Sequence, residues 1–264
     1  YNNLYLIFKI INIIINIMSI EIILCEFGEK RNSAGGAHNI LPTNRLNPTY
    51  ETFKKYFPNS KFTVYTDIKS LKSSQDIKIV YVNPPVSLQP HHPRYGWRCN
   101  DYYKIYGLLN ITCDYGIAVD ADMAAVSDKV KNIITITDKF GICFPNNPRF
   151  ICDVDFKIGA DAGKIINDSS KYCTIVNMSP ITYKKGDKRG EILLKKYLEL
   201  FLKNPCRGPN VASNSIWETG IYPYLLPFNW CICNDHINHK YTKNNEIILH
   251  VGQTNVFNYW KQNF

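Results

Sequence analysis

The sequence predicts an α/β fold with a mostly parallel central sheet flanked by helices. From Met18 onward, short apolar runs alternate with segments of helical periodicity, which is the pattern of a sheet whose strands are joined by helices. Several of the apolar runs end in acidic or polar residues, as expected where strand ends carry a ligand site. The 264 residues, 45% of them hydrophobic, fit one domain, which we expect to span residues 18–264.

The first third of that domain is expected to hold strands at 20–27, 61–65 and 78–82 and a helix at 50–56. A proline-rich loop over 84–93 follows, and then a helix over 97–109. This helix is predicted from apolar residues at near-helical spacing, with Arg98, Asp101 and Lys104 between them.

That helix leads into a short apolar run, Gly116–Val119, which ends in Asp120 and Asp122. Alternate residues of a strand share a face, roughly 6–7 Å apart, so both carboxylates can converge on one cation if the chain turns there. Hard oxygen ligands at a strand's carboxyl end suit Mg²⁺ or Mn²⁺. A solvated loop tip is the alternative, and Asp153 and Asp155 form a second pair with the same spacing.

The second half continues the alternation, with a helical segment at 127–139, strands at 140–144 and 172–178, and a helix at 191–203. Residues 150–161 are expected to form one side of the cleft or an ordinary charged hairpin. A last apolar strand from Ile247 runs into His250 and Gly252. A neutral imidazole there could complete a metal shell, and the glycine would let backbone approach a phosphate.

These blocks together resemble the GT-A-type nucleotide-sugar glycosyltransferases, and among them the glycogenin-like retaining enzymes of family 8. The resemblance covers about residues 19–260, and order and spacing carry it more than any one motif. Its matching segments are Asp120-Ala-Asp-Met123, His250-Val-Gly252 with Trp260, Phe57–Asp67 and Leu226–Trp230.

The resemblance implies a GT-A-type, Rossmann-like fold and a metal-dependent, hexosyltransferase-like enzyme. Its donor would be a nucleoside-diphosphate sugar, expected to be a UDP-sugar, and its acceptor a glycan, protein or small molecule. Asp120, Asp122 and His250 would hold Mn²⁺ or Mg²⁺. The donor would be bound by a second set of residues: Asp67, Arg98, Asp101, Lys104, Ala121, Gly252 and Gln253. The candidates for the catalytic group are Asp153, Asp155, Asp161 and Glu218.

The chain departs from the family at two points. Only Val251 separates His250 from Gly252, where the family usually has two residues, and the next lysine is as late as Lys261. Residues 210–218 also lack a clear aspartate-glutamine pair of the kind that lines the sugar in the glycogenin group. Two alternatives therefore stay open: a homologue that binds nucleotide sugars without catalysis, and a phosphatase-like hydrolase that attacks phosphate with the first aspartate.

The formal net charge is +9, but the lysines are spread along the chain, so a nucleic-acid partner is not expected. Most of the nine cysteines sit in apolar runs, as reduced core residues do, which predicts a cytoplasmic protein. Within 231–239, two cysteines and two histidines lie close together. A strand that places Cys231 and Cys233 on one face is a simpler interpretation of this segment than a zinc site.

Residues 1–17 form an apolar extension rich in isoleucine and asparagine. Lys9, Asn12 and Asn16 interrupt this run, which is shorter than the roughly 20 apolar residues of a membrane-spanning helix. We favour a segment upstream of a translation start at Met18. A membrane anchor or interfacial helix and a packed native segment are the alternatives, and membrane association is expected only through this extension.

Overall fold

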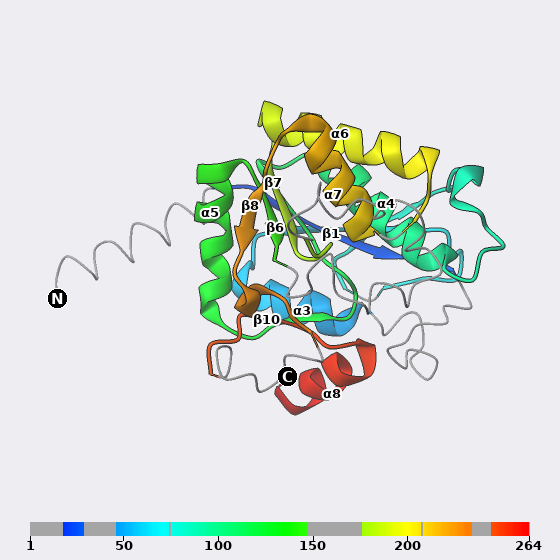
Figure 1. Ribbon diagram of the computed structural model, residues 1–264. Helices are drawn as coiled ribbons and strands as arrows, with labels where there is room; N and C mark the ends of the chain where they lie inside the picture. The colour runs from blue at the N-terminus through cyan, green and yellow to red at the C-terminus, as the bar shows by residue number, and fades with distance from the viewer. Residues whose placement is uncertain are drawn as a thin grey trace.

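The computed structural model describes residues 18–28, 46–73, 75–146, 176–206, 208–233 and 244–263. Within these ranges the protein is an α/β structure built on a central sheet of seven strands, with helices on both faces (Figure 1). The extension at 1–17 and the predicted strand or hairpin at 150–161 lie outside the described residues, as does most of the predicted strand at 172–178.

The central sheet has the strand order β3-β2-β1-β4-β7-β6-β8. Neighbouring strands from β3 to β4 are parallel, β7 runs antiparallel to both of its neighbours, and β8 is parallel to β6. The predicted α/β class and the mostly parallel sheet are therefore confirmed. The strands are β1 (Ile20–Glu26), β2 (Lys61–Thr66), β3 (Lys78–Tyr81), β4 (Tyr115–Ala118), β6 (Ile142–Pro145), β7 (Ile181–Lys184) and β8 (Tyr224–Leu226).

Helices cover the sheet because its central strands are apolar on both faces. In β1, Ile23 and Cys25 belong to one buried core, and Ile22 and Leu24 belong to the other. The first core is closed by α4 (Tyr95–Leu109), α6 (Lys188–Lys203) and α7 (Gly208–Thr219), which lie together in Figure 1. The second is closed by α3 (Asn47–Tyr56) and α5 (Asn132–Phe140).

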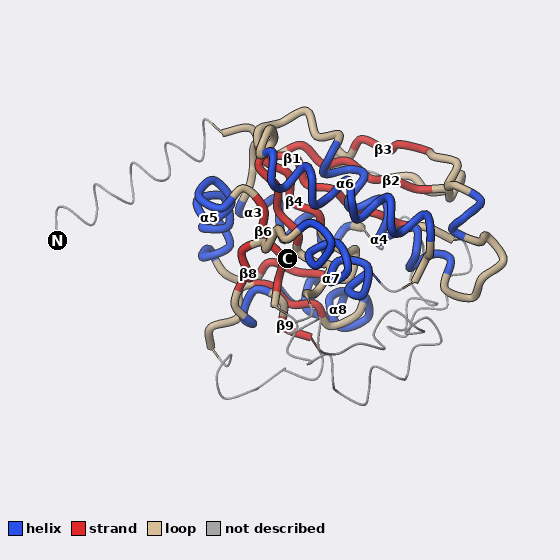
Figure 2. The backbone as a smooth tube through the Cα atoms, turned by 45° about the horizontal axis from the view of Figure 1, so that its top comes forward, coloured by secondary structure: helices blue, strands red, loops and turns tan. Residues whose placement is uncertain are grey.

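A second, three-stranded sheet has the order β5-β10-β9; β10 is labelled in Figure 1 and β9 in Figure 2. Its middle strand is antiparallel to β5 and parallel to β9. Its strands and the remaining helical segments are β5 (Met123–Ala125), β9 (Ile232–Cys233), β10 (Ile248–His250), α8 (Gln253–Asn263) and the short 3-10 turns η2 (Val86–Leu88), η3 (Asp128–Lys131) and η5 (Phe228–Trp230).

Several boundaries differ from the prediction by one to three residues; for example, the helix predicted at 50–56 begins at Asn47 and the helix predicted at 191–203 begins at Lys188. The expected strand at 140–144 begins only at Ile142, because Phe140 is the last residue of α5 and Gly141, with φ of 76°, ends that helix. The expected helix at 127–139 divides into η3 and α5. Strand β9 lies where a strand through Cys231 and Cys233 was expected, whereas helices α7 and α8 and the short strands β5, β7 and β8 were not predicted.

None of the helices in the described part of the chain combines the length and the apolarity that crossing a bilayer requires.

Candidate metal centre

The three predicted metal ligands come together at the carboxyl end of β4. Strand β4 ends at Ala118, and the chain then turns through residues 121–122 into β5, which directs the side chains of Asp120 and Asp122 to one place. His250 Nε2 lies 3.3 Å from Asp122 Oδ1 and 3.5 Å from Asp120 Oδ2. One ligand atom from each residue fits within 4.8 Å of the others, a spread that one ion could bridge.

Strand pairing explains how a distant histidine reaches this turn. In the antiparallel pair of β5 and β10, His250 is the register partner of Met123, the residue directly after Asp122. The buried Thr49 of α3 also binds β5, because its hydroxyl donates a hydrogen bond of 2.7 Å to the Met123 carbonyl. The acidic turn and the histidine are therefore positioned by backbone pairing as well as by side-chain contact.

A buried ammonium group supports Asp120. Lys104 of α4 is 1% exposed, and its Nζ lies 2.9 Å from Asp120 Oδ1, 3.2 Å from Asp101 Oδ1 and 3.0 Å from Ser179 Oγ. These contacts use all three N–H donors of the lysine. The side chain is thus an internal cation beneath the metal ligands, and its predicted contact with the donor diphosphate stays a prediction.

The charges of the centre are coupled. Burial alone would raise the pKa of Asp120, but the Lys104 ammonium and then His250 hold that pKa below its usual range. Burial would lower the pKa of His250, yet the adjacent Asp122 carboxylate and its hydrogen bond raise this pKa well above the ordinary value. In the absence of an ion, these contacts favour a protonated imidazole that pairs with the two carboxylates.

Asp67 lies at the neighbouring carboxyl end of β2, where it joins three elements. Its Oδ1 accepts the backbone N–H of Gly28, just after β1, at 2.9 Å, and its Oδ2 accepts the Tyr95 hydroxyl at 2.9 Å. Because β2, β1 and β4 are adjacent and parallel, Asp67 and Asp120 share one edge of the sheet. This is the edge at which ligands of open α/β sheets bind.

Two other predicted donor-binding residues of α4 have internal partners. Asp101 Oδ2 accepts the N–H of Gly208 at 3.1 Å, which ties the start of α7 to α4. Arg98 is 5% exposed and directs its guanidinium to Gln89 Oε1, at 2.6 Å, and to His92 Nε2, at 3.2 Å. Both side chains thus brace the structure around the site, and these contacts do not point to a diphosphate.

The segment after His250 provides backbone groups. Gly252 has φ of 79°, a conformation that favours glycine, and its carbonyl accepts the N–H of Val256 in the first turn of α8. Gln253 is the first residue of this helix, so its N–H belongs to the orphan donors of a helix N-terminus. Ala121, between the two aspartates, is 2% exposed and packs in the core.

Of the four catalytic candidates, the described residues include Glu218 alone. Asp153, Asp155 and Asp161 lie outside the described residues. Glu218 is on α7 with its side chain 48% exposed, 3.8 Å from Lys196 on the outer helix α6. The structure therefore does not bring Glu218 to the metal ligands.

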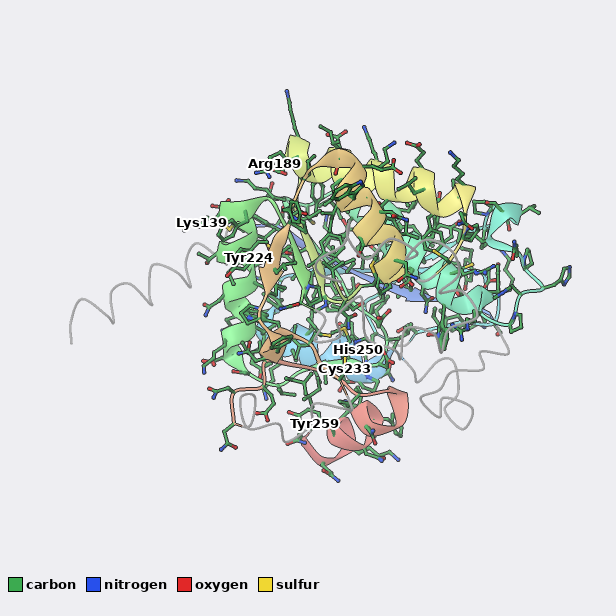
Figure 3. All side chains as sticks on the ribbon, viewed as in Figure 1. Lys139, Arg189, Tyr224, Cys233, His250 and Tyr259 are labelled. Carbon is green, nitrogen blue, oxygen red and sulfur yellow. The ribbon has the colours of Figure 1, made fainter. Side chains whose placement is uncertain are left out.

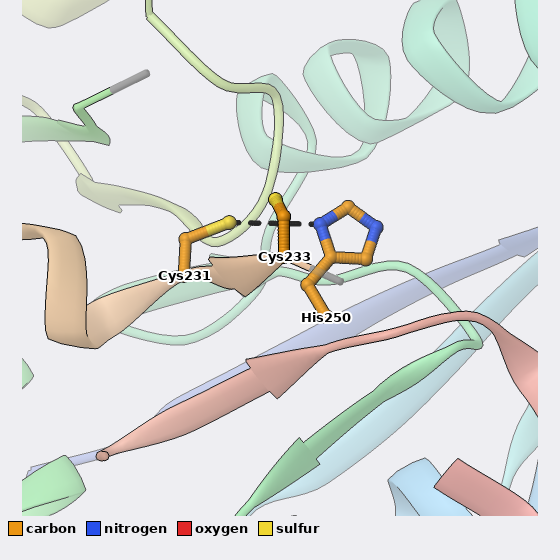
Figure 4. Close-up of side chains that lie close together, drawn as sticks. All are labelled: Cys231, Cys233 and His250. Atoms are coloured by element: carbon orange, nitrogen blue, oxygen red, sulfur yellow. Dashed lines mark hydrogen bonds between the residues drawn. The ribbon is translucent and has the colours of Figure 1, made fainter. Parts of the chain in front are cut away.

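Ser179 was not predicted as part of the site, and Cys231 and Cys233 were not expected to lie beside His250. Ser179 donates its hydroxyl hydrogen to Asp120 Oδ2 at 2.7 Å, and no sequence pattern marks this serine. Cys231 and Cys233 were expected to share a strand face, and they do so directly beside His250 (Figures 3 and 4). The spacing of Cys231 and Cys233 at alternate positions was the sequence signal that could have placed them together beside a common partner.

The sequence matches no protein-family model, and comparison with curated proteins finds no match. The function is therefore inferred from the geometry of the site and the resemblance of its motifs.

Proposed function

We propose that the protein is a GT-A-type, metal-dependent glycosyltransferase that uses a nucleoside-diphosphate sugar, with a UDP-sugar the expected donor. The observation that carries the proposal is the meeting of Asp120, Asp122 and His250 at the carboxyl edge of the sheet. The resemblance of the motifs predicts this junction from their order and spacing along the chain. Local sequence alone would not bring these residues together.

The donor set fits the ion that this activity needs. Two carboxylates and one imidazole offer hard oxygen ligands with a single nitrogen, which suits Mn²⁺, while Mg²⁺ more often takes oxygen ligands alone. When bound, such an ion supplies Lewis-acid stabilisation of the departing diphosphate. Asp120 and Asp122 hold it in place, and Lys104 with Ser179 fixes the rotamer of Asp120.

The surroundings favour a nucleotide over a smaller ligand. Asp67 and Gly28 lie at the ends of adjacent strands, on the nucleoside side that the family resemblance implies. The first turn of α8 begins soon after His250, and N–H groups at a helix start attract phosphate oxygens. We therefore assign the nucleoside to the end of β2 and the diphosphate to the metal ligands and the first turn of α8.

The contacts of Asp120 argue against the phosphatase alternative. A hydrolase of that class would need this first carboxylate as its nucleophile. Here Lys104 binds Oδ1 and Ser179 binds Oδ2, so both oxygens are already hydrogen-bonded. A carboxylate keeps lone pairs for a metal under these conditions, but its nucleophilicity is reduced.

The test is release of nucleoside diphosphate from a panel of UDP- and GDP-sugars by the full chain, with Mn²⁺, Mg²⁺ or a chelator. We expect Mn²⁺-dependent release, and a fall of at least about a hundredfold in Asp122→Asn, equivalent to about 2.7 kcal/mol of transition-state free energy. Asp138→Asn is the matched control, since Asp138 is a half-exposed carboxylate paired with Lys184.

Three outcomes distinguish the candidates. Metal-dependent release lost only in Asp122→Asn supports the transferase. Mn²⁺-dependent binding of a UDP-sugar without any release supports a non-catalytic homologue. Hydrolysis of a simple phosphate monoester, lost in Asp120→Asn, would support the hydrolase and overturn the proposal.

A further inference from the structure

Behind the acidic turn, His250 faces a second group of ligand atoms. Strand β9 pairs in parallel with β10, and Cys233 is the register partner of His250. Cys231, two residues earlier, lies on the same face as Cys233 because side chains alternate along an extended chain. The two sulfurs and the imidazole converge in Figure 4, with one atom from each residue within 4.8 Å of the others.

The separation of Cys231 Sγ and His250 Nδ1 matches the geometry of a tetrahedral ion. Zinc binds sulfur at about 2.3 Å and imidazole nitrogen at about 2.05 Å, so the two ligands of one ion stand about 3.6 Å apart. Cys231 Sγ and His250 Nδ1 are 3.5 Å apart. This pair of ligand atoms is therefore already close to the spacing that such an ion would impose, and the Cys233 sulfur lies within 4.8 Å of the Cys231 sulfur and of a ring nitrogen of His250.

We propose that Cys231, Cys233 and His250 Nδ1 form a binding site for a thiophilic divalent ion of the zinc class. Thiolate sulfur is a soft ligand that selects zinc over manganese or magnesium. Three protein ligands leave a fourth position for water or an exogenous ligand, as in open zinc sites. Binding would displace the thiol protons of both cysteines.

The opposite edge of His250 strengthens this assignment. A metal on Nδ1 leaves the proton on Nε2, and that nitrogen lies 3.3 Å from Asp122 Oδ1. A metal-bound histidine commonly donates its other N–H to a carboxylate in this way. Asp122 would then orient the imidazole of the zinc-class site, whereas it ligates the ion directly in the proposed transferase site.

A single neutral imidazole offers only one lone pair, so it can serve one ion at a time. A zinc-class ion on Nδ1 places a proton where Mn²⁺ would bind Nε2, and Mn²⁺ on Nε2 places a proton toward the cysteines. We therefore expect the two ions to compete through His250, although their remaining ligands differ. This inference does not depend on the transferase activity.

The first test is direct binding of Co²⁺, a spectroscopic substitute for zinc, and of Zn²⁺ by the full chain under reducing conditions. We expect one thiophilic ion per chain, with a thiolate-to-cobalt charge-transfer absorption. Cys233→Ser should abolish that absorption and weaken Zn²⁺ binding by more than a hundredfold. Cys113→Ser, a buried cysteine of another part of the core, is the control and should leave both unchanged.

Further variants separate this site from the transferase site. Asp122→Asn should weaken Zn²⁺ binding by about ten- to a hundredfold, the usual effect of losing an orienting partner, while it removes Mn²⁺ binding. In the unmodified chain, Zn²⁺ should displace bound Mn²⁺, detected by the paramagnetic resonance of the freed ion. In Cys233→Ser this displacement should require far more Zn²⁺. Cys231 is buried and Cys233 only half-buried, so Cys233→Ser is the variant expected to keep the fold.

Zn²⁺ binding that survives loss of both cysteines but fails in Asp120→Asn would overturn the inference, since the ion would then use the acidic site. Cobalt binding without a thiolate band would also overturn it and would leave a thiol–imidazole hydrogen bond. Thiolate-dependent Zn²⁺ binding in a chain that binds no Mn²⁺ would support this site and remove the proposed function.

Discussion

Replacing Lys104 with methionine tests whether the lysine supports the metal ligands or binds substrate. The change keeps the length of the side chain but removes the ammonium that contacts Asp101, Asp120 and Ser179. Breaking a buried ion pair on one side typically costs about 3–5 kcal/mol. Both carboxylates are less than a fifth exposed but can still reach water, so we expect the lower end, about 3 kcal/mol at neutral pH.

The assay is thermal and urea unfolding without metal. For a protein of this size, about 3 kcal/mol corresponds to a fall of about 6–12 °C in Tm. The control is Lys195→Met, which removes an exposed pair with Glu191 and should cost less than about 1 kcal/mol. The pKa of Asp120 is lowered in the folded protein, so the stability from its pair is present at neutral pH and is lost as pH falls below about 3.9. The difference between Lys104→Met and the unmodified protein should therefore narrow in acid.

Addition of Mn²⁺ should recover part of the stability of Lys104→Met, because an ion can replace the missing positive charge beside Asp120. A different result would refute this reasoning. If Lys104→Met unfolds at the same temperature as Lys195→Met but binds UDP-sugar more weakly, the lysine is a substrate contact and the described internal pairing is not what holds the site.

Three further predictions concern other parts of the site. At neutral pH, Mn²⁺ binding should release about one proton, because the raised pKa of His250 favours a protonated imidazole until the ion displaces that proton. Calorimetry in buffers of different ionisation enthalpy measures the number of protons released. A Mn²⁺ affinity that does not change between pH 6 and 8 would contradict this prediction. Gly208→Ala should lower the free energy of unfolding in urea by about 1–3 kcal/mol, since an added Cβ would lie 2.5 Å from an Asp101 oxygen. An unchanged urea midpoint would show that the start of α7 can shift without loss of stability. Trp260→Phe removes the 2.6 Å hydrogen bond from the Trp260 indole of α8 to Glu51 of α3. In a hydrogen-exchange measurement, the backbone amides of α8 should therefore exchange faster. Unchanged protection of these amides would mean that apolar packing alone holds α8 in place.

The sequence was most informative where side-chain type and burial agree. Strand β4 and helix α4 follow from apolar periodicity, and the acidic turn follows from the residues after the strand. The burial of Lys104 was not predicted, because a sequence pattern equates charge with exposure. Helix α4 is packed against the sheet and against α6 and α7, so it buries polar residues along with its apolar face.

Helix α7 shows the complementary failure. Its sequence is rich in small polar residues, yet Ser215 is fully buried and Ser213 nearly so. Each donates its hydroxyl hydrogen to a carbonyl four residues earlier in the chain, which satisfies the hydroxyl without a solvent partner. Hydrophobic periodicity therefore gives no sign that these serines are buried. The pairing of β5, β9 and β10 was not predicted for a different reason, since it depends on contacts between segments distant in sequence.

The position of β10 between β5 and β9 also affects the order in which the site can form during synthesis. The acidic turn leaves the ribosome long before the strand that carries His250, and β5 lacks its partner until then. A two-carboxylate turn without the histidine should hold a divalent ion weakly. Tight metal binding would thus begin only once β10 has paired with β5. From that moment the ion would link the acidic turn to β10 and so close the long chain segment between residues 122 and 250.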